Sequence, residues 1–143
     1  MPTSSRRQFL VAASVTLAAL VLPRERALAH GVSRRRANIP HPTPRPGITA
    51  AKILPREQLK ASSKVLDTFD AVRAIPQVVD GIRCNCGCAE RPDFYSLLTC
   101  YEGKAPMALS CGVCQGQGAL AVRLHAEGKS LDEIRAAVDA KFA

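Results

Sequence analysis

The chain has 143 residues with no tryptophan, 4% aromatic residues and a formal net charge of +8. This length suits one domain, and the shortage of aromatic side chains argues against a nucleic-acid partner whose bases stack on aromatic platforms. The positive charge gathers in the first third of the chain, at Arg6, Arg7, Arg24, Arg26, Arg34, Arg35, Arg36 and Arg45, and the rest is nearly neutral.

Residues 1–29 have the pattern of an export signal. The pair Arg6-Arg7 precedes an uncharged run from Phe9 to Leu22, which is shorter than the about 20 residues that a membrane span needs. Ala27-Leu28-Ala29 then supplies small residues for cleavage before His30. We therefore expect a twin-arginine signal peptide and a periplasmic protein, with an uncleaved membrane-associated helix as the alternative. Because this pathway moves folded proteins, it favours a loaded metal site over disulfides.

Residues 30–54 are expected to form a basic, Pro-rich, disordered linker. Prolines 40, 42, 44 and 46 alternate with polar residues, which removes backbone donors and favours extended backbone. Such a segment is a semi-rigid spacer. Its basic run 34–36 offers a contact with anionic lipid headgroups at a membrane surface.

Residues 55–143 are predicted to form a small, mainly α-helical domain with a Cys-rich loop. Apolar spacing predicts a helix over 56–74, a short helix starting at Pro76, a turn or two of helix over 93–101 and a helix from Cys111 or Gly112 to His125. Gly128 is placed to end that helix, and Ser130-Leu-Asp-Glu133 is a capping box that begins the last one.

Six cysteines occur in the order C-x-C-x-C, C, C-x-x-C: Cys84, Cys86, Cys88, Cys100, Cys111 and Cys114. Three thiols at period two do not share one face of a helix, but they can converge on a loop if Gly87 turns the backbone. The C-x-x-C pair suits a helix N-terminus, which favours thiolate. Disulfides remain an alternative, giving a stapled adaptor protein. Neighbouring C-x-C residues pair poorly, however, so full oxidation would split the C-x-x-C pair.

A metal site can use all of the thiols without splitting the C-x-x-C pair. Four thiolates close a tetrahedral Zn²⁺ site, and six leave a surplus that suits a small Cu(I)–thiolate cluster. All six cysteines are therefore candidate metal ligands. His30, with His41 or His125, is a weaker candidate for Cu(II). No hydrolase or phosphate-binding motif is present, so catalysis is not required.

The chain resembles the PCYCGC-motif proteins, which are small exported bacterial proteins suspected of binding metal. The resemblance covers residues 65–143 and is carried by Ile75-Pro76, Cys84-Asn-Cys-Gly-Cys88, Cys100-Tyr101, Cys111-Gly-Val-Cys114 and Gly128-Lys-Ser-Leu-Asp-Glu-Ile134. Arg83 and Asn85 stand where the motif has proline and tyrosine, and no histidine lies between Cys88 and Cys114. The family tends to carry histidines between its cysteines, so their absence from this stretch makes a more thiolate-rich site the expectation.

A shorter stretch, Cys111-Gly-Val-Cys114-Gln-Gly-Gln117, is similar to CcmH-type thiol reductants of cytochrome c maturation. That similarity implies an alternative function, a thiol–disulfide oxidoreductase acting through Cys111 and Cys114. The other four cysteines have no counterpart there. The favoured hypothesis is a protein that stores, delivers or detoxifies copper or zinc, with another periplasmic metalloprotein as its expected partner.

Overall fold

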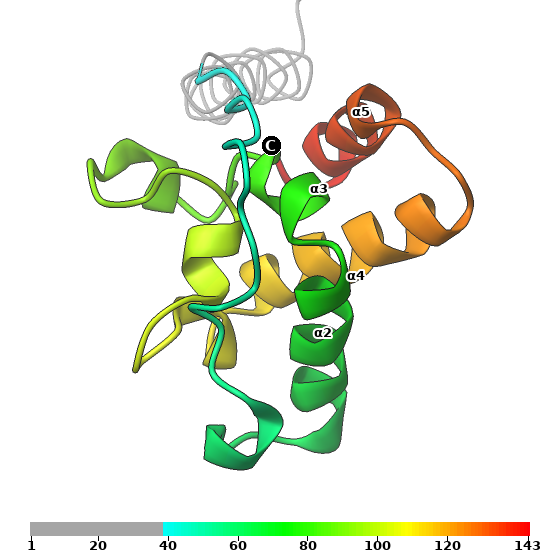
Figure 1. The fold of residues 1–143 in the computed structure, drawn as a ribbon. Helices are drawn as coiled ribbons and strands as arrows, with labels where there is room; N and C mark the ends of the chain where they lie inside the picture. Colours follow the sequence, from blue (N-terminus) through cyan, green and yellow to red (C-terminus); the bar gives the residue numbers. More distant parts are fainter. Residues whose placement is uncertain (1–38) are drawn as a thin grey trace, which may run out of the picture. The chain divides into compact units, whose positions relative to one another are not determined.

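The computed structural model describes residues 39–143, and within this range it contains helices and turns but no strand. The four α-helices are α2 (Ser63–Ala74), α3 (Pro76–Asp80), α4 (Gly112–Ala126) and α5 (Leu131–Phe142) (Figure 1). One short 3-10 turn precedes α2, and three more lie between α3 and α4. The mainly α prediction is confirmed for this range. The predicted signal peptide and residues 30–38 of the predicted linker lie outside the described residues.

Helix α2 is shorter than the predicted helix over 56–74. Residues Arg56–Gln58 form a 3-10 turn, η1, and Ser62 is in extended backbone just before α2 begins. The extended residues Leu59 and Ser62 interrupt the helical hydrogen bonding, which apolar spacing alone does not reveal. Phe69 and Val72 of α2 are fully buried. Phe69 packs edge-on against Tyr101, with ring centroids 4.9 Å apart.

Helices α4 and α5 form a pair whose ends were readable in the sequence. Gly128, with φ of +77°, follows α4 in the left-handed conformation, and the N–H groups of Gly128 and Lys129 bond to the carbonyls of His125 and Leu124. This is a Schellman motif. The capping box at Ser130 and Glu133 is present at the start of α5. The two predicted boundaries are confirmed.

Helix α4 lies at the centre of the described fold. It packs against α2, α3 and α5, and Figure 1 shows it passing behind α2. The segment predicted as a helical turn or two over 93–101 contains a 3-10 turn, η3 (Leu98–Tyr101), which is buried throughout except at Thr99. Turn η4 (Met107–Leu109) also packs against α4. None of the helices over 39–143 is long and apolar enough to cross a membrane.

Residues 39–54, which composition assigns to a linker, instead lie against the helical domain, and we call them the strap. Arg45 bonds to the buried carboxylate of Asp80, Tyr95 Oη donates to the carbonyl of Thr43 at 2.5 Å, and Arg135 donates to the carbonyl of Pro42 at 2.8 Å. The prolines suit this role because they have no N–H to leave unpaired. The spacer prediction therefore does not describe this segment.

Candidate metal centre

The C-x-C-x-C sequence forms a tight loop between α3 and a 3-10 turn, η2 (Cys88–Glu90). Gly87 has φ of +96°, in the left-handed region that favours glycine. As the sequence suggested, this glycine turns the backbone so that the thiols at alternating positions converge. The Sγ atoms of Cys84 and Cys86 are 3.1 Å apart, and those of Cys86 and Cys88 are 3.0 Å apart.

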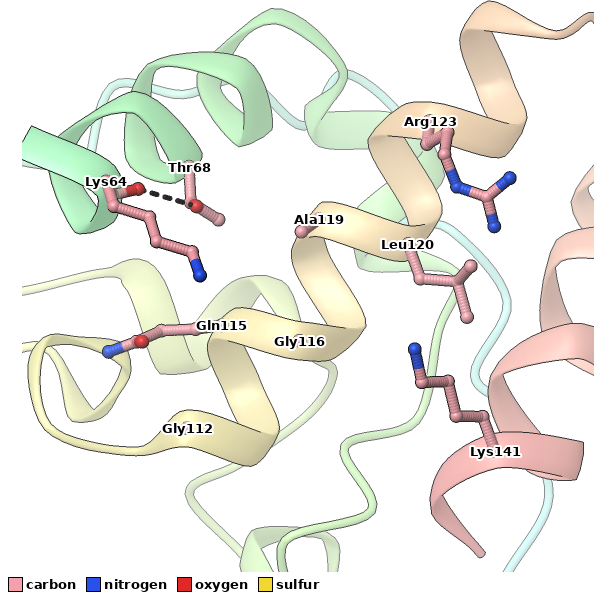
Figure 2. A pocket seen from close by; sticks show the side chains of 9 residues that line it. All are labelled: Lys64, Thr68, Gly112, Gln115, Gly116, Ala119, Leu120, Arg123 and Lys141. Atoms are coloured by element: carbon pink, nitrogen blue, oxygen red, sulfur yellow. Dashed lines mark hydrogen bonds between the residues drawn. The ribbon is translucent and has the colours of Figure 1, made fainter.

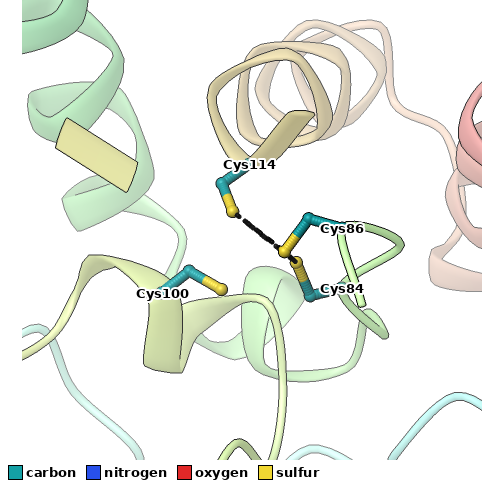
Figure 3. A group of neighbouring side chains, drawn as sticks. All are labelled: Cys84, Cys86, Cys100 and Cys114. Carbon is teal, nitrogen blue, oxygen red and sulfur yellow. Dashed lines mark hydrogen bonds between the residues drawn. The ribbon is translucent and has the colours of Figure 1, made fainter. Parts of the chain in front are cut away.

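Two further segments bring thiols to this loop. Cys100 lies on η3 and Cys114 in the first turn of α4. The Sγ atoms of Cys84, Cys86, Cys100 and Cys114 all lie within 4.8 Å of one another (Figure 3). Cys114 Sγ is 3.6 Å from each of the Cys84 and Cys86 Sγ atoms. We call these four thiols the sulfur pocket.

The remaining two cysteines lie at the edge of the sulfur pocket. Cys88 contacts it through Cys86. Cys111 is the N-cap of α4, where its Sγ accepts the N–H of Cys114 at 3.4 Å, and its thiol also interacts with Cys86. All six cysteines are free thiols. The structure therefore brings all six predicted residues into one neighbourhood, with four in a compact group and two beside it.

Hydrogen bonds between the thiols lower the pKa of some cysteines and raise the pKa of others. Bonds from Cys100 and Cys114 lower the pKa of Cys84 to about 3, whereas bonds with Cys100 and Cys84 raise the pKa of Cys114. Burial raises the pKa of Cys86. The metal-free pocket thus favours one thiolate surrounded by protonated thiols. Binding a cation there would release the remaining protons.

A polar network that the cysteine pattern did not reveal holds the loop in place. Asp139 of α5 accepts bonds from Arg83 at 2.8 Å and from Asn85 at 3.2 Å, and Arg83 also donates to Asn85 at 3.0 Å. Arg83 and Asn85 are the two residues that depart from the PCYCGC motif. Both side chains are buried, and they flank Cys84. Because they are hydrogen-bonded to each other, the two departures from the motif form one network.

His41 of the strap belongs to the same network. Its Nδ1 accepts the backbone N–H of Arg83 at 3.0 Å, so its Nε2 carries the proton and donates to Asp139, also at 3.0 Å. Both ring nitrogens are used, which leaves His41 unsuited to the Cu(II) site considered above. His125 is exposed on α4, and His30 lies outside the described residues.

Gln117 is the other buried polar group beside the pocket. It lies one turn after Cys114 on α4, and its Oε1 accepts the N–H of Asn85 at 3.3 Å. Within residues 39–143, its Nε2 has no hydrogen-bond partner although the side chain is fully buried. Since the Asn85 N–H requires the oxygen on its side, the amide cannot simply be reversed. Such an unpaired buried donor is uncommon in folded proteins.

A hollow of about 400 Å³ runs along the surface of α4 from Gly112, the residue after Cys111 (Figure 2). Lys64, Arg123 and Lys141 line it, together with the small residues Gly112, Gly116 and Ala119. Three positive side chains make this hollow unsuitable for a cation. The sulfur pocket is therefore the candidate site for metal.

Comparison with known proteins places the chain in a family. No curated protein and no solved structure gives a significant match. A family model described as "Protein of unknown function with PCYCGC motif" matches residues 47–143, which is more than half of the chain and includes part of the strap and all six cysteines. The chain therefore belongs to the PCYCGC-motif family.

Proposed function

We propose that this chain is an exported metal-handling protein that binds Cu(I), or alternatively Zn²⁺, through its cysteines. The observation that carries the proposal is the sulfur pocket, in which four Sγ atoms from three separate segments lie within 4.8 Å of one another. Soft thiolates select Cu(I) and zinc over hard cations such as magnesium and calcium. Storage, delivery and detoxification all require such a site and no catalytic group.

The spacing of the thiols fits direct metal ligation. Zn–S bonds of about 2.3 Å imply Sγ–Sγ separations of about 3.8 Å in a tetrahedron. The separations from Cys114 are 3.6 Å, and the Cys84–Cys86 separation of 3.1 Å would widen by well under 1 Å. Side-chain rotation alone can supply such a shift.

The number of thiols favours Cu(I) over a single Zn²⁺ ion. Four cysteines satisfy zinc, yet Cys88 and Cys111 also adjoin the pocket. Bridging thiolates around more than one Cu(I) ion would use all six. The side chain of Tyr101, which follows Cys100 in the chain, is fully buried and uncharged and helps to keep water away from the cluster.

The geometry gives less support to a dithiol reductant. In such a protein the reactive thiol pair works alone, but here Cys114 contacts Cys84 and Cys86 and is fully buried. The redox hypothesis also leaves Cys100 without a role. Export by the twin-arginine pathway remains part of the proposal, because loading with Cu(I) or zinc in a reducing compartment keeps the thiols from pairing.

The test is to purify the full chain anaerobically and measure its metal content and mass under native and denaturing conditions. We expect either several Cu(I) ions or one Zn²⁺ ion, lost on denaturation. Cys100→Ser should lower the affinity by at least about tenfold, whereas Ala108→Ser, which adds a hydroxyl at another buried site, should keep it. A metal-free protein lighter by about 6 Da, the mass of the hydrogens lost in three disulfides, would support the stapled adaptor instead.

A further inference from the structure

The six thiols differ in their access to solvent. Cys100 and Cys114 are 0% exposed, and Cys84 and Cys88 are also buried. Only Cys86 and Cys111 are partly exposed. Among the six thiols, Cys86 and Cys111 are therefore the ones that a metal carrier can reach most readily from solvent.

Cys111 is the better placed of the two to meet a molecule from outside. Cys86 Sγ is surrounded by the Sγ atoms of Cys84, Cys88 and Cys114, at 3.0 to 3.6 Å. Cys111, by contrast, lies between the exposed residues Ser110 and Gly112, and Val113 beyond them is 37% exposed. The neighbouring residue Gly112 lines the hollow that carries Lys64, Arg123 and Lys141, so the surface beside Cys111 favours an anionic complex over a cationic one.

Cys111 is also connected to the interior thiols. Its Sγ receives the N–H of Cys114, and its thiol interacts with those of Cys86 and Cys114. At the N-terminus of α4, free backbone N–H groups favour negative charge on the sulfur. A metal ion bound to Cys111 can therefore pass to Cys86 or Cys114 while it stays coordinated by sulfur throughout.

The geometry points to Cys111 as the exchange ligand, the residue at which Cu(I) enters and leaves the sulfur pocket, and to a small thiolate-ligated Cu(I) complex as its donor. This inference rests on the proposed function. In the first step a Cys111 Sγ–Cu bond forms and one donor S–Cu bond breaks. The proton of the Cys111 thiol passes to the released donor thiolate, and copper stays Cu(I). Cys86 and Cys114 then replace the remaining donor ligands in the same way.

Transfer kinetics separate this role from that of a buried ligand. Full-length reduced protein is loaded with Cu(I)–glutathione, and Cu(I) removal by bathocuproine disulfonate is followed by stopped-flow absorbance. Cys111→Ser should slow both loading and removal by about tenfold, because exchange rates depend on access to the attacking sulfur. Its Cu(I) affinity should fall by much less than that of Cys100→Ser, because the four thiols of the sulfur pocket remain and both directions slow together. The buried-ligand control Cys100→Ser should lose affinity and release Cu(I) faster.

The outcomes distinguish the two proposals. Wild-type protein that takes up no Cu(I) overturns both of them. If the wild type binds Cu(I) and Cys111→Ser exchanges it at the wild-type rate, the exchange role alone is overturned. The same holds if Cys111→Ser loses as much affinity as Cys100→Ser, because Cys111 would then be an ordinary ligand.

A labelling experiment on the wild type needs no variant and covers the case in which Cys111→Ser does not fold. A bulky maleimide is added briefly to the reduced, metal-free protein, and the labelled cysteines are identified by peptide mass mapping. Cys111 should react first. Earlier labelling of Cys86 would move the exchange point to that residue and overturn the inference.

Discussion

Gly118 of α4 sets how closely the segment carrying Cys100 can approach the helix carrying Cys114. A Cβ at this position would lie 2.1 Å from Tyr101 Oη and 3.1 Å from Val72 Cγ2. Tyr101 follows Cys100, and its hydroxyl donates to the carbonyl of Cys114 at 2.8 Å. The absent side chain therefore permits a hydrogen bond that ties two ligand-bearing segments together.

Replacing Gly118 with Ala should lower the free energy of unfolding by about 1–3 kcal/mol, because overpacking a fully buried contact displaces its neighbours. Adding Tyr101→Phe removes the nearest atom and should restore part of this loss. Gly112→Ala serves as the matched control, since a Cβ there meets nothing within 4 Å. Urea denaturation of the single and double variants measures the coupling. Strictly additive effects would mean that the two side chains do not compete for the same space.

At the scale of elements, α5 stabilises the C-x-C-x-C loop through the side chain of Asp139. The Asp139 carboxylate accepts hydrogen bonds from Arg83 and Asn85 of the loop and from His41 of the strap. Burial raises the pKa of Asp139, but the bond from His41 and the other donors outweigh it and lower the pKa below its usual value. The carboxylate is thus charged at neutral pH and holds the side chains of Arg83 and Asn85, the two residues that flank Cys84.

Asp139→Ala should destabilise the fold by about 2 kcal/mol, since it removes a charged acceptor from the buried Arg83 side chain. The estimate lies below the range for fully buried pairs because the Asp139 side chain is 37% exposed. Metal affinity should fall as well, through loss of loop order. Asp132→Ala, on the same helix but 88% exposed, should change stability by less than about 0.5 kcal/mol. Chemical denaturation and chelator competition measure the two effects; equal results for both variants would exclude the support role.

The parts of this fold that could be predicted from the sequence are those with local signals. The capping box at Ser130, the left-handed Gly128 and the N-cap position of Cys111 each depend on residues within one helical turn, and all are present. The convergence of the thiols followed from cysteine spacing and Gly87. Asp139 and Gln117 were missed because their partners lie 54 and 32 residues away, respectively, and no short pattern links them.

At the scale of the whole molecule, the strap shows where composition misleads. Alternating prolines and basic residues are typical of a solvated spacer, yet Arg45 meets Asp80, which lies 35 residues further on and is fully buried on α3. Arg45 donates from both its backbone and its guanidinium, and Ser96 Oγ donates to the same carboxylate at 2.8 Å. Asp80 can therefore be buried on α3 because Arg45 of the strap supplies the opposite charge. Residues 47–54 of the strap also belong to the part that the family model matches.

This ion pair predicts a pH-dependent stability. Burial raises the pKa of Asp80, but hydrogen bonds from Arg45 outweigh it and leave the pKa below the ordinary value of 3.8. A carboxyl with a lowered pKa in the folded state stabilises the fold above its unfolded pKa. That contribution is lost as the pH falls through the folded value. The contribution of Arg45 should therefore be complete at pH 7 and should decline in acid, below the ordinary pKa of aspartate.

Arg45→Met removes the partner and leaves Asp80 buried, which should cost about 2 kcal/mol at pH 7. This is below the range for fully buried pairs because the Arg45 side chain is 34% exposed. Below about pH 4 the difference from the wild type should shrink, since Asp80 becomes protonated in both proteins. Arg91→Met, which removes an exposed pair with Asp93, should show little effect at any pH. Urea denaturation between pH 2.5 and 7, a range set about the usual aspartate pKa, gives the comparison. A difference that stays constant across it would show that Arg45 acts through packing of its side chain rather than through its charge.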